Sequence, residues 1–531
     1  MRFFAFGLML FLTIAFAVLG AVVALPWLWG LIVTLPLTLV GIYDLVQHER
    51  NVLRNYPILG HIRFMAEYIR PEIHQYFVES DIDGTPFDHN ERNIIQTRAR
   101  GLSAAKPFGT ELDVYGDEYE WINHSIAAKP EPDPDKMPRI EIGGPQCAHP
   151  YASSVLNISA MSFGALGSHA IMALNKGAKL GHFAHDTGEG GLSQYHRKHG
   201  GDLIWELGSG YFGCRNDDGT FNADMFREQA QTDQVKMVEI KLSQGAKPGH
   251  GGMLPAAKVT PEIAATRKVP VGQDCLSPAA HSAFSTPVEL LEFVAKLREL
   301  SGGKPAGFKL CIGHRWEFLA VCKAMLETGI LPDFIVIDGA EGGTGAAPLE
   351  LSDGVGTPLR EGLMFAHNAL VGAGLRDRIR IGASGKAVTG YKIAANLALG
   401  ADWCNTARGF MFSLGCIQAQ RCHTGRCPTG ITTLDPRRQR SLIVDEKAQN
   451  ACRFHYYTVK TVGLIAAAAG LDHPGQLGPE HLYLRVSSDE VRTAAEFYDH
   501  LQPGELLDGS THAMYRRYWD MARADSFAPA V

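Results

Sequence analysis

The chain has 531 residues, 46% of them hydrophobic and 20% charged, so it can bury a core larger than a single small domain needs. Its net charge is −6, and no basic stripe interleaved with aromatic residues is present, which excludes nucleic acid as a partner. Most of the ten cysteines are scattered through apolar runs, a pattern typical of core thiols in a reducing compartment and not of a disulfide framework.

The first 44 residues are predicted to anchor the chain in a membrane. Residues 3–25 form a continuous apolar run, long enough at about 1.5 Å per residue to cross a hydrocarbon layer of roughly 30 Å. A second apolar run, 31–43, favours a transmembrane hairpin over residues 1–44, because neither a single anchor nor a cleaved signal peptide needs it. The catalytic part is expected to face the cytoplasm at the cell membrane, since three basic residues follow the second run: Arg50, Arg54 and Arg63.

The chain beyond the hairpin is expected to form three regions. Residues 45–138 are polar and aromatic and end in a Pro- and acid-rich linker, 129–138, which cannot continue a helix. The main domain is predicted over 139–485. A capping-box pattern at Ser487 predicts that a carboxyl-terminal helical tail begins there and extends over 486–531.

Eight short β-branched runs are the predicted strands of the main domain. Helical patterns such as 287–300 and 386–399 separate several of them, and a further helix is predicted over 448–470. This alternation predicts an α/β fold with a parallel sheet, a (β/α)8 TIM barrel, with an open doubly wound sheet as the alternative. No Gly-x-Gly-x-x-Gly follows the first run, which argues against a dinucleotide-binding unit. The eight runs are 155–159, 182–185, 235–242, 269–274, 307–311, 334–338, 379–383 and 401–405.

Three cysteines form a compact Cys-x5-Cys-x4-Cys array, at Cys416, Cys422 and Cys427. Neither a helical nor a strand period places all three on one face, whereas a loop around an inorganic cluster uses all three. Pro428 directly follows the array, as in bacterial cluster loops that end Cys-Pro. A structural zinc site or buried thiols are the alternatives, but zinc usually takes a fourth ligand and shorter Cys pairs. The array therefore favours an iron–sulfur cluster.

Glycine-rich polar loops follow successive predicted strands, where a barrel carries its functional groups. One such loop is a common turn, but a rim of them lets backbone approach a flat ligand that bears a phosphate. The last two loops follow the seventh and eighth strands, the usual phosphate site of such barrels, and Ser384 and Arg408 could hold a phosphate there. Flavin mononucleotide (FMN) fits this description.

Five stretches together resemble the FMN-binding domain of glutamate synthase, which reduces 2-iminoglutarate, and the resemblance extends over about 155–482. They occur in the family's order and are 159–165, 187–191, 244–252, 342–346 and 416–428. The resemblance implies an FMN barrel beside a [3Fe-4S] cluster held by the three cysteines of the array.

The resemblance also implies roles for individual side chains. Lys247 and Arg267 match residues that bind the two carboxylates of a 2-oxo diacid, and Glu189 matches a carboxylate that handles protons near the flavin. Lys241 or Lys309 would stabilise the negative charge of reduced flavin. Without the motifs, we would interpret each of these charged side chains as solvated or structural. We interpret His185, His281 and His423 as structural. The cofactor contacts are expected from Met161, Ser162, Lys241, Gln244, Lys309, Gly342, Gly343, Ser384, Gly385, Arg408 and Gly409.

The chain departs from the family pattern at its ends and in one loop. Whole glutamate synthase begins with a glutamine amidotransferase domain and ends with a β-helix domain, neither of which this sequence resembles, so we expect no glutamine hydrolysis by this polypeptide. The family usually has glutamate at the position of His250 and glutamine at that of Met253. The surface that faces the substrate is therefore expected to differ.

The expected activity is the reduction of 2-iminoglutarate, formed from 2-oxoglutarate and ammonia, to glutamate. Ammonia would be free or delivered by a separate glutaminase subunit. The electron donor would be ferredoxin or a reductase subunit, because no NAD(P)-binding domain is evident. Two alternatives remain: an N-substituted glutamate synthase-like enzyme, which the changes at His250 and Met253 suggest, and a membrane electron-transfer flavoprotein.

Overall fold

A computed structural model describes residues 2–102, 104–105, 107–133, 136–254 and 256–530 of the chain. Residues 134–135 of the predicted linker lie outside the described residues, as does the side chain of Met253. The chain divides into two compact units, residues 1–89 and residues 90–531.

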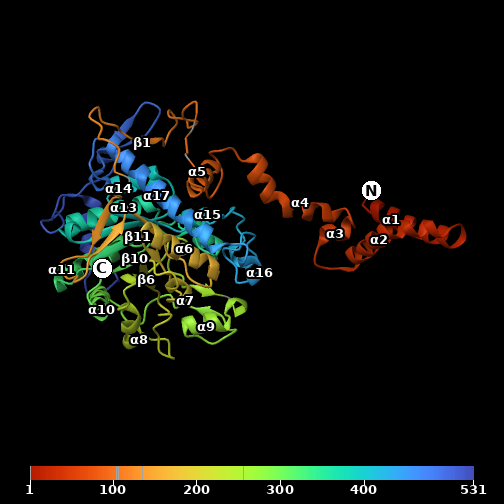
Figure 1. The fold of residues 1–531 in the computed structure, drawn as a ribbon, viewed down its shortest axis with the longest axis horizontal. Coiled ribbons are helices and arrows are strands. Elements are labelled where there is room, and N and C mark those ends of the chain that lie inside the picture. Colours follow the sequence, from red (N-terminus) through yellow and green to blue (C-terminus); the bar gives the residue numbers. More distant parts are fainter. Residues whose placement is uncertain (1, 103, 106, 134–135, 255, 531) are drawn as a thin grey trace. The chain divides into compact units, whose positions relative to one another are not determined.

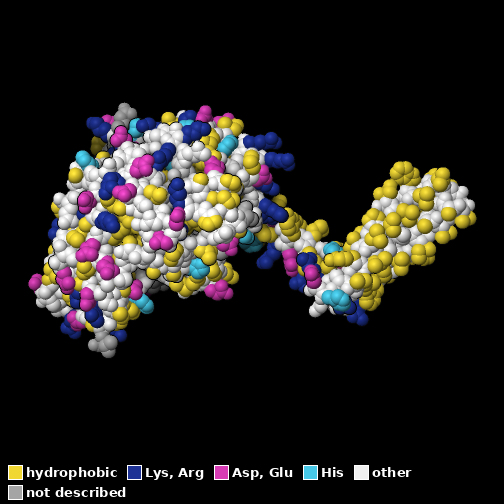
Figure 2. All heavy atoms as spheres, turned by 90° about the horizontal axis from the view of Figure 1, so that it is seen from below, with side chains coloured by type: hydrophobic (Ala, Val, Ile, Leu, Met, Phe, Trp, Pro, Cys, Tyr) yellow, Lys and Arg dark blue, Asp and Glu magenta, His cyan; other side chains and the backbone are white. Residues whose placement is uncertain are grey.

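The first unit begins with a hairpin of two apolar helical segments. The first segment is α1 (Phe4–Val22), and the second, Leu25–Val46, consists of η1 (Leu25–Gly30) and α2 (Leu31–Val46); both are long and apolar enough to cross a membrane. The hydroxyl oxygens of Thr13 and Thr38 lie 2.8 Å apart and join the two helices. Most of the remaining side chains are exposed, unlike those of a core helix, and Figure 2 shows the hairpin covered with hydrophobic atoms.

The end of α2 fixes the next turn of the first unit. Asp44 is fully buried, and its carboxylate accepts a hydrogen bond of 2.9 Å from the backbone N–H of Ile58 and contacts His61 Nε2, also at 2.9 Å. These contacts join the end of α2 to the start of α4 (Gly60–Ile73), with α3 (Asn51–Asn55) between them, and the π-helical turn η2 (His74–Val78) follows α4.

A closed barrel of eight parallel strands forms the centre of the second unit. Neighbouring strands pair in regular register, for example Lys309 opposite Lys241 and Cys404 opposite Leu156. The prediction of a TIM barrel is confirmed, and closure excludes the open doubly wound sheet. The strands, in barrel order, are β4 (Leu156–Ile158), β5 (His185–Asp186), β6 (Leu203–Leu207), β7 (Val235–Lys241), β10 (Ala306–Leu310), β11 (Phe334–Asp338), β12 (Arg380–Ser384) and β13 (Trp403–Thr406).

One predicted strand is wrong, and one strand was missed. Residues 269–274 form no strand; Pro270 lacks an N–H donor, and Gly272 adopts a positive φ of 69° in a turn. The missing strand is β6, whose apolar pattern is interrupted by Glu206. The predicted run 182–185 overlaps β5 only at His185, and the other six predicted runs coincide with strands.

Helices surround the barrel, as Figure 1 shows. The predicted helix 287–300 is confirmed as α10 (Pro287–Leu300), which begins with a capping box between Thr286 and Glu289. The other two predicted helices have shifted ends, α14 (Gly390–Ala398) and α17 (Val444–Ala468). The remaining helices of this layer are α6 (Ser168–Gly181), α7 (Gln194–Arg197), α8 (Ala223–Ala230), α9 (Pro261–Arg267), α11 (Arg315–Thr328), α12 (Leu349–Gly354), α13 (Leu359–Gly372), α15 (Arg408–Ser413) and α16 (Pro436–Gln439).

The helix predicted to begin at Ser487 is wrong. Residues 486–490 form a hairpin turn, closed by the N–H of Val486 donating to the carbonyl of Glu490 at 2.9 Å. The turn joins β14 (Leu482–Arg485) to β15 (Val491–Thr493), and β14 also pairs with β1 (Glu120–Ile122). Thr493 then caps α18 (Ala494–Phe497), and the tail ends with α19 (Ala513–Met521), which packs on α11. The second unit also contains α5 (His89–Ala99) except for its first residue.

An apolar cluster fills the amino-terminal end of the barrel. Ile142 and Tyr151, from the hairpin of β2 (Arg139–Ile142) and β3 (Tyr151–Ser154), pack against barrel side chains that include Phe334 and Trp403. This cluster closes the interior of the barrel at that end, and barrels of this kind carry their functional groups at the opposite, carboxyl end of the strands.

Candidate active site at the carboxyl end of the barrel

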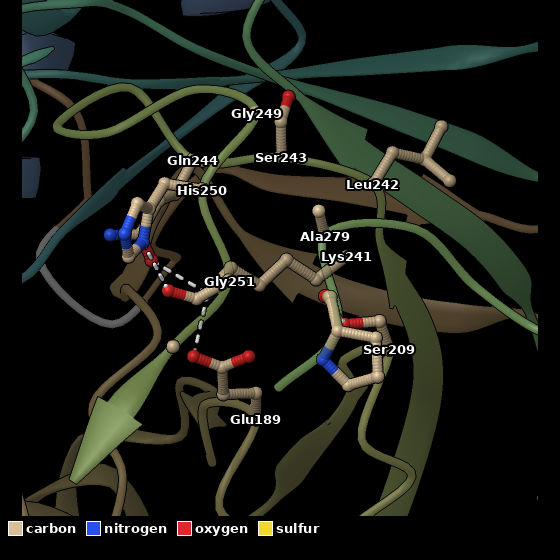
Figure 3. Close-up of a pocket in the computed structure, with 12 residues that line it drawn as sticks. Glu189, Ser209, Lys241, Leu242, Ser243, Gln244, Gly249, His250, Gly251 and Ala279 are labelled. Atoms are coloured by element: carbon tan, nitrogen blue, oxygen red, sulfur yellow. Dashed lines mark hydrogen bonds and ion pairs between the residues drawn. The ribbon is translucent and has the colours of Figure 1, made fainter. Parts of the chain in front are cut away.

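Glu189 and Lys241 form an ion pair at the carboxyl end of the barrel. Glu189 lies in the loop after β5 and Lys241 ends β7, and the ammonium nitrogen is 2.9 Å from Oε1 of the carboxylate. The same ammonium donates to Oε1 of Gln244 at 2.6 Å. Figure 3 shows the three side chains converging on a pocket. The pocket is also lined by Ser209, Ser243, Gly249, His250, Gly251, Gly252, Pro278 and Ala279.

Close backbone packing holds Glu189 in place. A Cβ atom on Gly252 would lie 2.3 Å from Oε1 of Glu189, and one on Gly208 would lie 2.5 Å from Oε2, so a larger residue at either position would displace the carboxylate. Burial alone would raise the pKa of Glu189, but Lys241, followed by Arg267 and Lys247, outweighs it, and the pKa is lowered. Glu189 is therefore a carboxylate at neutral pH and can accept a proton.

Lys247 and Arg267, the predicted carboxylate ligands, lie near Glu189, since the charge of each lowers its pKa. Both cations are 5% exposed. Burial lowers the pKa of Lys247. The guanidinium of Arg267 lies 5.2 Å from the centre of the Phe212 ring, and its three hydrogen bonds are long, between 3.4 and 3.7 Å. Its Nε is buried without a hydrogen-bond partner among the described residues. An anionic ligand would satisfy both buried cations.

His250 lies at the pocket, where the family usually has glutamate. It is exposed, and its Nδ1 donates to the carbonyl of Gly251 at 2.8 Å, which leaves Nε2 directed to a ligand or to water. The pocket therefore contains an imidazole ring, whereas a glutamate at this position would add a second carboxylate and its negative charge to that of Glu189.

A second group of predicted residues gathers after β12 and β13. The hydroxyl oxygens of Ser384 and Ser159 lie 3.3 Å apart, and Arg408 donates to the carbonyl of Glu341 at 2.7 Å. Lys386, which the sequence analysis missed, joins them. Burial and then the charge of Arg408 lower the pKa of Lys386. Cationic groups that repel one another beside glycine backbone, at Gly385 and Gly409, suit a bound phosphate.

The loops that carry the remaining predicted cofactor contacts are tied together. The N–H of Gly245 donates to Asp338 Oδ2 at 2.8 Å, joining the loops after β7 and β11. Gly343 packs against Arg408, since a Cβ there would lie 2.8 Å from its Nε. Gly342 lies in the same loop, and Met161 and Ser162 contact the glycine loop of Glu189 through Gly188. The Nε2 atom of Gln244 is buried and has no hydrogen-bond partner among the described residues. It is therefore free to donate a hydrogen bond to a polar ligand.

Lys309, the alternative to Lys241 beside the flavin, points into the barrel below the mouth. It is 4% exposed and forms ion pairs with Glu206 and, at 3.5 Å, with Glu239. Of the two lysines, Lys241 lines the pocket. A substrate or cofactor atom at the mouth would therefore meet Lys241 directly.

The three cysteines of the array lie on one irregular loop between α15 and α16. Burial, and then the charges of Cys422 and Cys427, raise the pKa of the Cys416 thiol to about 12. Burial would also raise the pKa of Cys427, but hydrogen bonds from Thr429 and Thr432 outweigh it and lower the pKa to about 7. In the described chain the three sulfurs are not all within 4.8 Å of one another. Thiolates on one tetrahedral zinc ion would be about 3.8 Å apart.

The three histidines interpreted as structural have different environments. His281 contacts the carbonyl of Lys241 at 2.9 Å and the hydroxyl of Tyr211 at 3.0 Å, so it supports the end of β7. His185 is fully buried beside His196, and His423 lies in the cysteine loop.

Several side chains at this site were missed because their sequence signals are weak. Lys386 follows Ser384-Gly385 and could have been found as a third cation of the phosphate loop. Ser277, whose hydroxyl lies 3.5 Å from Oε2 of Glu189, follows a two-residue strand, β9 (Cys275–Leu276), that pairs with β8 (Met253–Leu254) and has no recognisable pattern. Glu206 and Asp186 face the barrel interior, which only the correct strand register reveals.

The fold and site together define a closed parallel barrel with an ion pair and two buried cations at its mouth. The model of the conserved region in glutamate synthase matches residues 129–472. The glutamate synthase large subunit-like protein YerD of Bacillus subtilis is 38% identical over 502 residues, which cover 87% of this chain and 95% of that protein. This chain therefore belongs to the glutamate synthase family and is a glutamate synthase-like oxidoreductase.

Two other relatives match a smaller part of their length. The archaeal-type glutamate synthase [NADPH] of Thermotoga neapolitana is 34% identical over 308 residues, 57% of each chain. The ferredoxin-dependent glutamate synthase 2 of Synechocystis is 34% identical over 257 residues, which cover 48% of this chain and 16% of that protein. The chain thus spans about half of the archaeal-type relative and a small part of the ferredoxin-dependent one.

Proposed function

We propose that this enzyme forms glutamate by reducing 2-iminoglutarate, which arises from 2-oxoglutarate and ammonia, with FMN and a [3Fe-4S] cluster as cofactors. The observation that carries the proposal is the pairing of an ionised Glu189 with Lys241 beside two buried cations, Lys247 and Arg267, for which the described residues offer no anionic partner at hydrogen-bond distance. A substrate with two carboxylates and one reacting carbon fits this arrangement.

The residues at the mouth of the barrel fit FMN. Ser384, Lys386 and Arg408, with the backbone of Gly385 and Gly409, would hold the phosphate after β12 and β13. The buried Nε2 of Gln244, which has no partner among the described residues, would donate to the ring system. When bound, FMN supplies the hydride for the imine carbon, and the cluster supplies electrons one at a time.

The side chains of this chain would bind the substrate and move protons. Lys247 and Arg267 bind its two carboxylates and so orient the reacting carbon. Glu189, kept ionised by Lys241, takes a proton from the nitrogen of the adduct that forms when ammonia attacks the carbonyl carbon, and returns a proton to the hydroxyl group that leaves as water when the imine forms. Lys241 places a positive charge where negative charge develops on reduction.

The cysteine array would hold the iron–sulfur cluster. Its three thiols lie on one loop, and the pKa of Cys427, lowered to about 7, favours the thiolate that iron requires. Three thiolates without a fourth are the ligand set of a [3Fe-4S] cluster. The donor is proposed to be ferredoxin or a pyridine-nucleotide reductase subunit, and the names of the two partial relatives include one example of each. A separate glutaminase subunit could supply ammonia.

The hairpin over residues 1–44 is proposed to anchor the enzyme in the cell membrane with the barrel on the cytoplasmic side. Two adjacent helices of 19 and 22 residues, whose apolar side chains are mostly exposed, support this proposal. The Thr13–Thr38 contact would satisfy the two hydroxyl groups between the helices in a hydrocarbon layer.

An N-substituted glutamate synthase-like activity is the second candidate, favoured by the imidazole of His250 at the pocket. Purified enzyme, reduced with dithionite, is incubated with 2-oxoglutarate and either ammonium or methylamine. Glutamate from ammonium supports the main proposal, and a product formed only with methylamine supports the second. Reoxidation by an artificial acceptor without any amino acid product would favour an electron-transfer flavoprotein.

A further inference from the structure

Four ionisable side chains meet inside the barrel, below the mouth. Asp186, Glu206, Glu239 and Lys309 come from β5, β6, β7 and β10, four consecutive strands of the barrel. Each is at most 4% exposed. The interior of a TIM barrel is normally filled by layers of branched apolar side chains, so a buried charged layer is unusual. We call these four residues the lumen cluster.

The strand faces show that the lumen cluster points inward. Trp205 stacks on Phe226 of the outer helix α8, so its neighbour Glu206 faces the interior. His185 lies beside His196 of α7 on the outside, so Asp186 also faces the interior. Glu206 and Glu239 are direct partners in the strand register and therefore lie side by side.

The lumen cluster cannot be fully ionised at neutral pH. Oxygen atoms of its three carboxyl groups all lie within 4.8 Å of one another, and Lys309 is the one cation in contact with them among the described residues. Three carboxylates and one ammonium would carry a net charge of −2 in a space that excludes water, where like charges at this distance repel strongly. The cluster therefore retains protons.

The hydrogen bonds indicate which carboxyl groups carry them. If both groups are ionised, Oδ2 of Asp186 and both carboxylate oxygens of Glu239 have no hydrogen-bond partner among the described residues. A proton on Glu239 would let it donate to Glu206. Burial, followed by repulsion from other carboxylates, raises the pKa of Glu239 well above its ordinary value and that of Asp186 to about 7. Burial would lower the pKa of Lys309, but Glu206 and Glu239 keep it raised and the side chain charged.

The lumen cluster is connected to the candidate active site directly above it. Asp186 Oδ1 accepts a hydrogen bond of 2.9 Å from the N–H of Gly188, in the loop of Glu189. The positive charge of Lys241 lowers the pKa of Asp186, and the negative charge of Asp338, at the end of β11, raises the pKa of Lys309. A change of charge at the mouth is therefore felt by the cluster.

We propose that the lumen cluster is a proton store, which binds one proton when the flavin at the mouth is reduced and releases it on reoxidation. The proposal rests on FMN binding as proposed above. Two electrons from the reductant and one proton go to the flavin and leave it negatively charged, and one further proton from solvent converts a cluster carboxylate into a carboxylic acid. The added proton compensates the new negative charge, and Asp186 is the group placed to take it up, because its Oδ2 has no hydrogen-bond partner among the described residues and its Oδ1 is bonded to the loop of Glu189.

The test is the pH dependence of the flavin midpoint potential of the full-length holoenzyme. Below about pH 7 Asp186 is already protonated, so one proton accompanies two electrons. Above that pH the wild type should take up two protons, and the slope of potential against pH should double. Asp186→Asn should keep the shallow slope throughout, and Glu239→Gln provides a second variant should the first fail to fold. Glu317→Gln is the control, because burial raises the pKa of Glu317 but the residue lies on the outer helix α11.

An infrared difference spectrum between oxidised and reduced enzyme gives an independent readout. A carboxylic acid C=O band that appears on reduction, shifts in D2O and is missing in Asp186→Asn supports the proton store. A shallow slope at every pH without such a band overturns it, even if the enzyme forms glutamate. A doubled slope in an enzyme that forms no amino acid would reject the proposed function and leave the proton store standing, and failure to bind flavin would overturn both.

Discussion

Replacement of Arg267 by alanine is expected to weaken 2-oxoglutarate binding while leaving the fold intact. The guanidinium is 5% exposed, and its three contacts, to Phe163, Ser162 and Cys275, are 3.4 to 3.7 Å long. The two contacts to oxygen are longer than the roughly 3.2 Å of a good N–H···O bond and the third is to a sulfur, a weak acceptor, so the charge remains available for a carboxylate. A charge-assisted hydrogen bond contributes about 1.5–3 kcal/mol, which corresponds to a KM increase of about 10- to 150-fold.

The assay is steady-state glutamate formation with dithionite-reduced enzyme at saturating ammonium, with flavin content and thermal unfolding measured in parallel. Arg215→Ala is the matched control, because Arg215 lies 5.6 Å from the centre of the same Phe212 ring. Its KM for 2-oxoglutarate should stay within roughly twofold of the wild type, and Arg267→Lys should fall between the two, since it keeps the charge but loses the planar fork. An unchanged KM in a folded, flavin-loaded Arg267→Ala enzyme would refute the assignment of Arg267 to a substrate carboxylate.

Four further predictions follow from the site and the fold. Glu189→Gln should lower kcat by roughly 10²- to 10⁴-fold with little change in KM, and a normal kcat would remove Glu189 from proton transfer. The free energy of unfolding should fall as the pH drops below about 6.5, because burial lowers the pKa of His455 to about 3, so that between these pH values only the unfolded state binds a proton on this residue. In urea titrations at pH 5, His455→Gln should recover up to about 2 kcal/mol of that loss. Equal losses of stability with pH in the wild type and the variant would contradict this prediction. Cys416→Ser should abolish the [3Fe-4S] electron paramagnetic resonance signal, whereas Cys322→Ser in α11 should retain it, and full iron content in both variants would argue against the array as ligand. Deletion of residues 1–44 should release a flavin-containing enzyme from the membrane fraction; persistence in the membrane would show another attachment.

The barrel could be predicted because its strands carry a strong local signal. β11 is a short apolar run that ends in a polar loop, and its type and limits follow from that pattern alone. β6 shows where the signal ends. Its fourth residue, Glu206, belongs to a buried charged layer, so the strand does not resemble a continuous apolar run. The register between strands decides that Glu206 meets Lys309, and a single sequence does not contain that register.

Part of the candidate site could also be predicted, because some of its residues lie in or beside recognisable motifs. Glu189 lies in a motif-bearing loop and Lys241 ends the strand before another, and the structure brings them to 2.9 Å from each other. Lys309 also lies near the end of a predicted strand, but its direction depends on the acidic side chains of two other strands. Ser277 depends on a loop path around Gly252 that no periodicity describes. Contacts between distant loops, and not residue type, therefore set the limit of prediction here.

The most direct test of the proposed function is a single turnover of the flavin-reduced enzyme under anaerobic conditions. Reduced protein is mixed with 2-oxoglutarate and ¹⁵N-ammonium, flavin absorbance is followed in a stopped-flow instrument, and the products are analysed by mass spectrometry. Formation of one ¹⁵N-glutamate for each flavin reoxidised is the predicted result. Flavin reoxidation without labelled glutamate, or no reoxidation while another imine or an artificial acceptor reacts normally, would contradict the assignment of glutamate as the product.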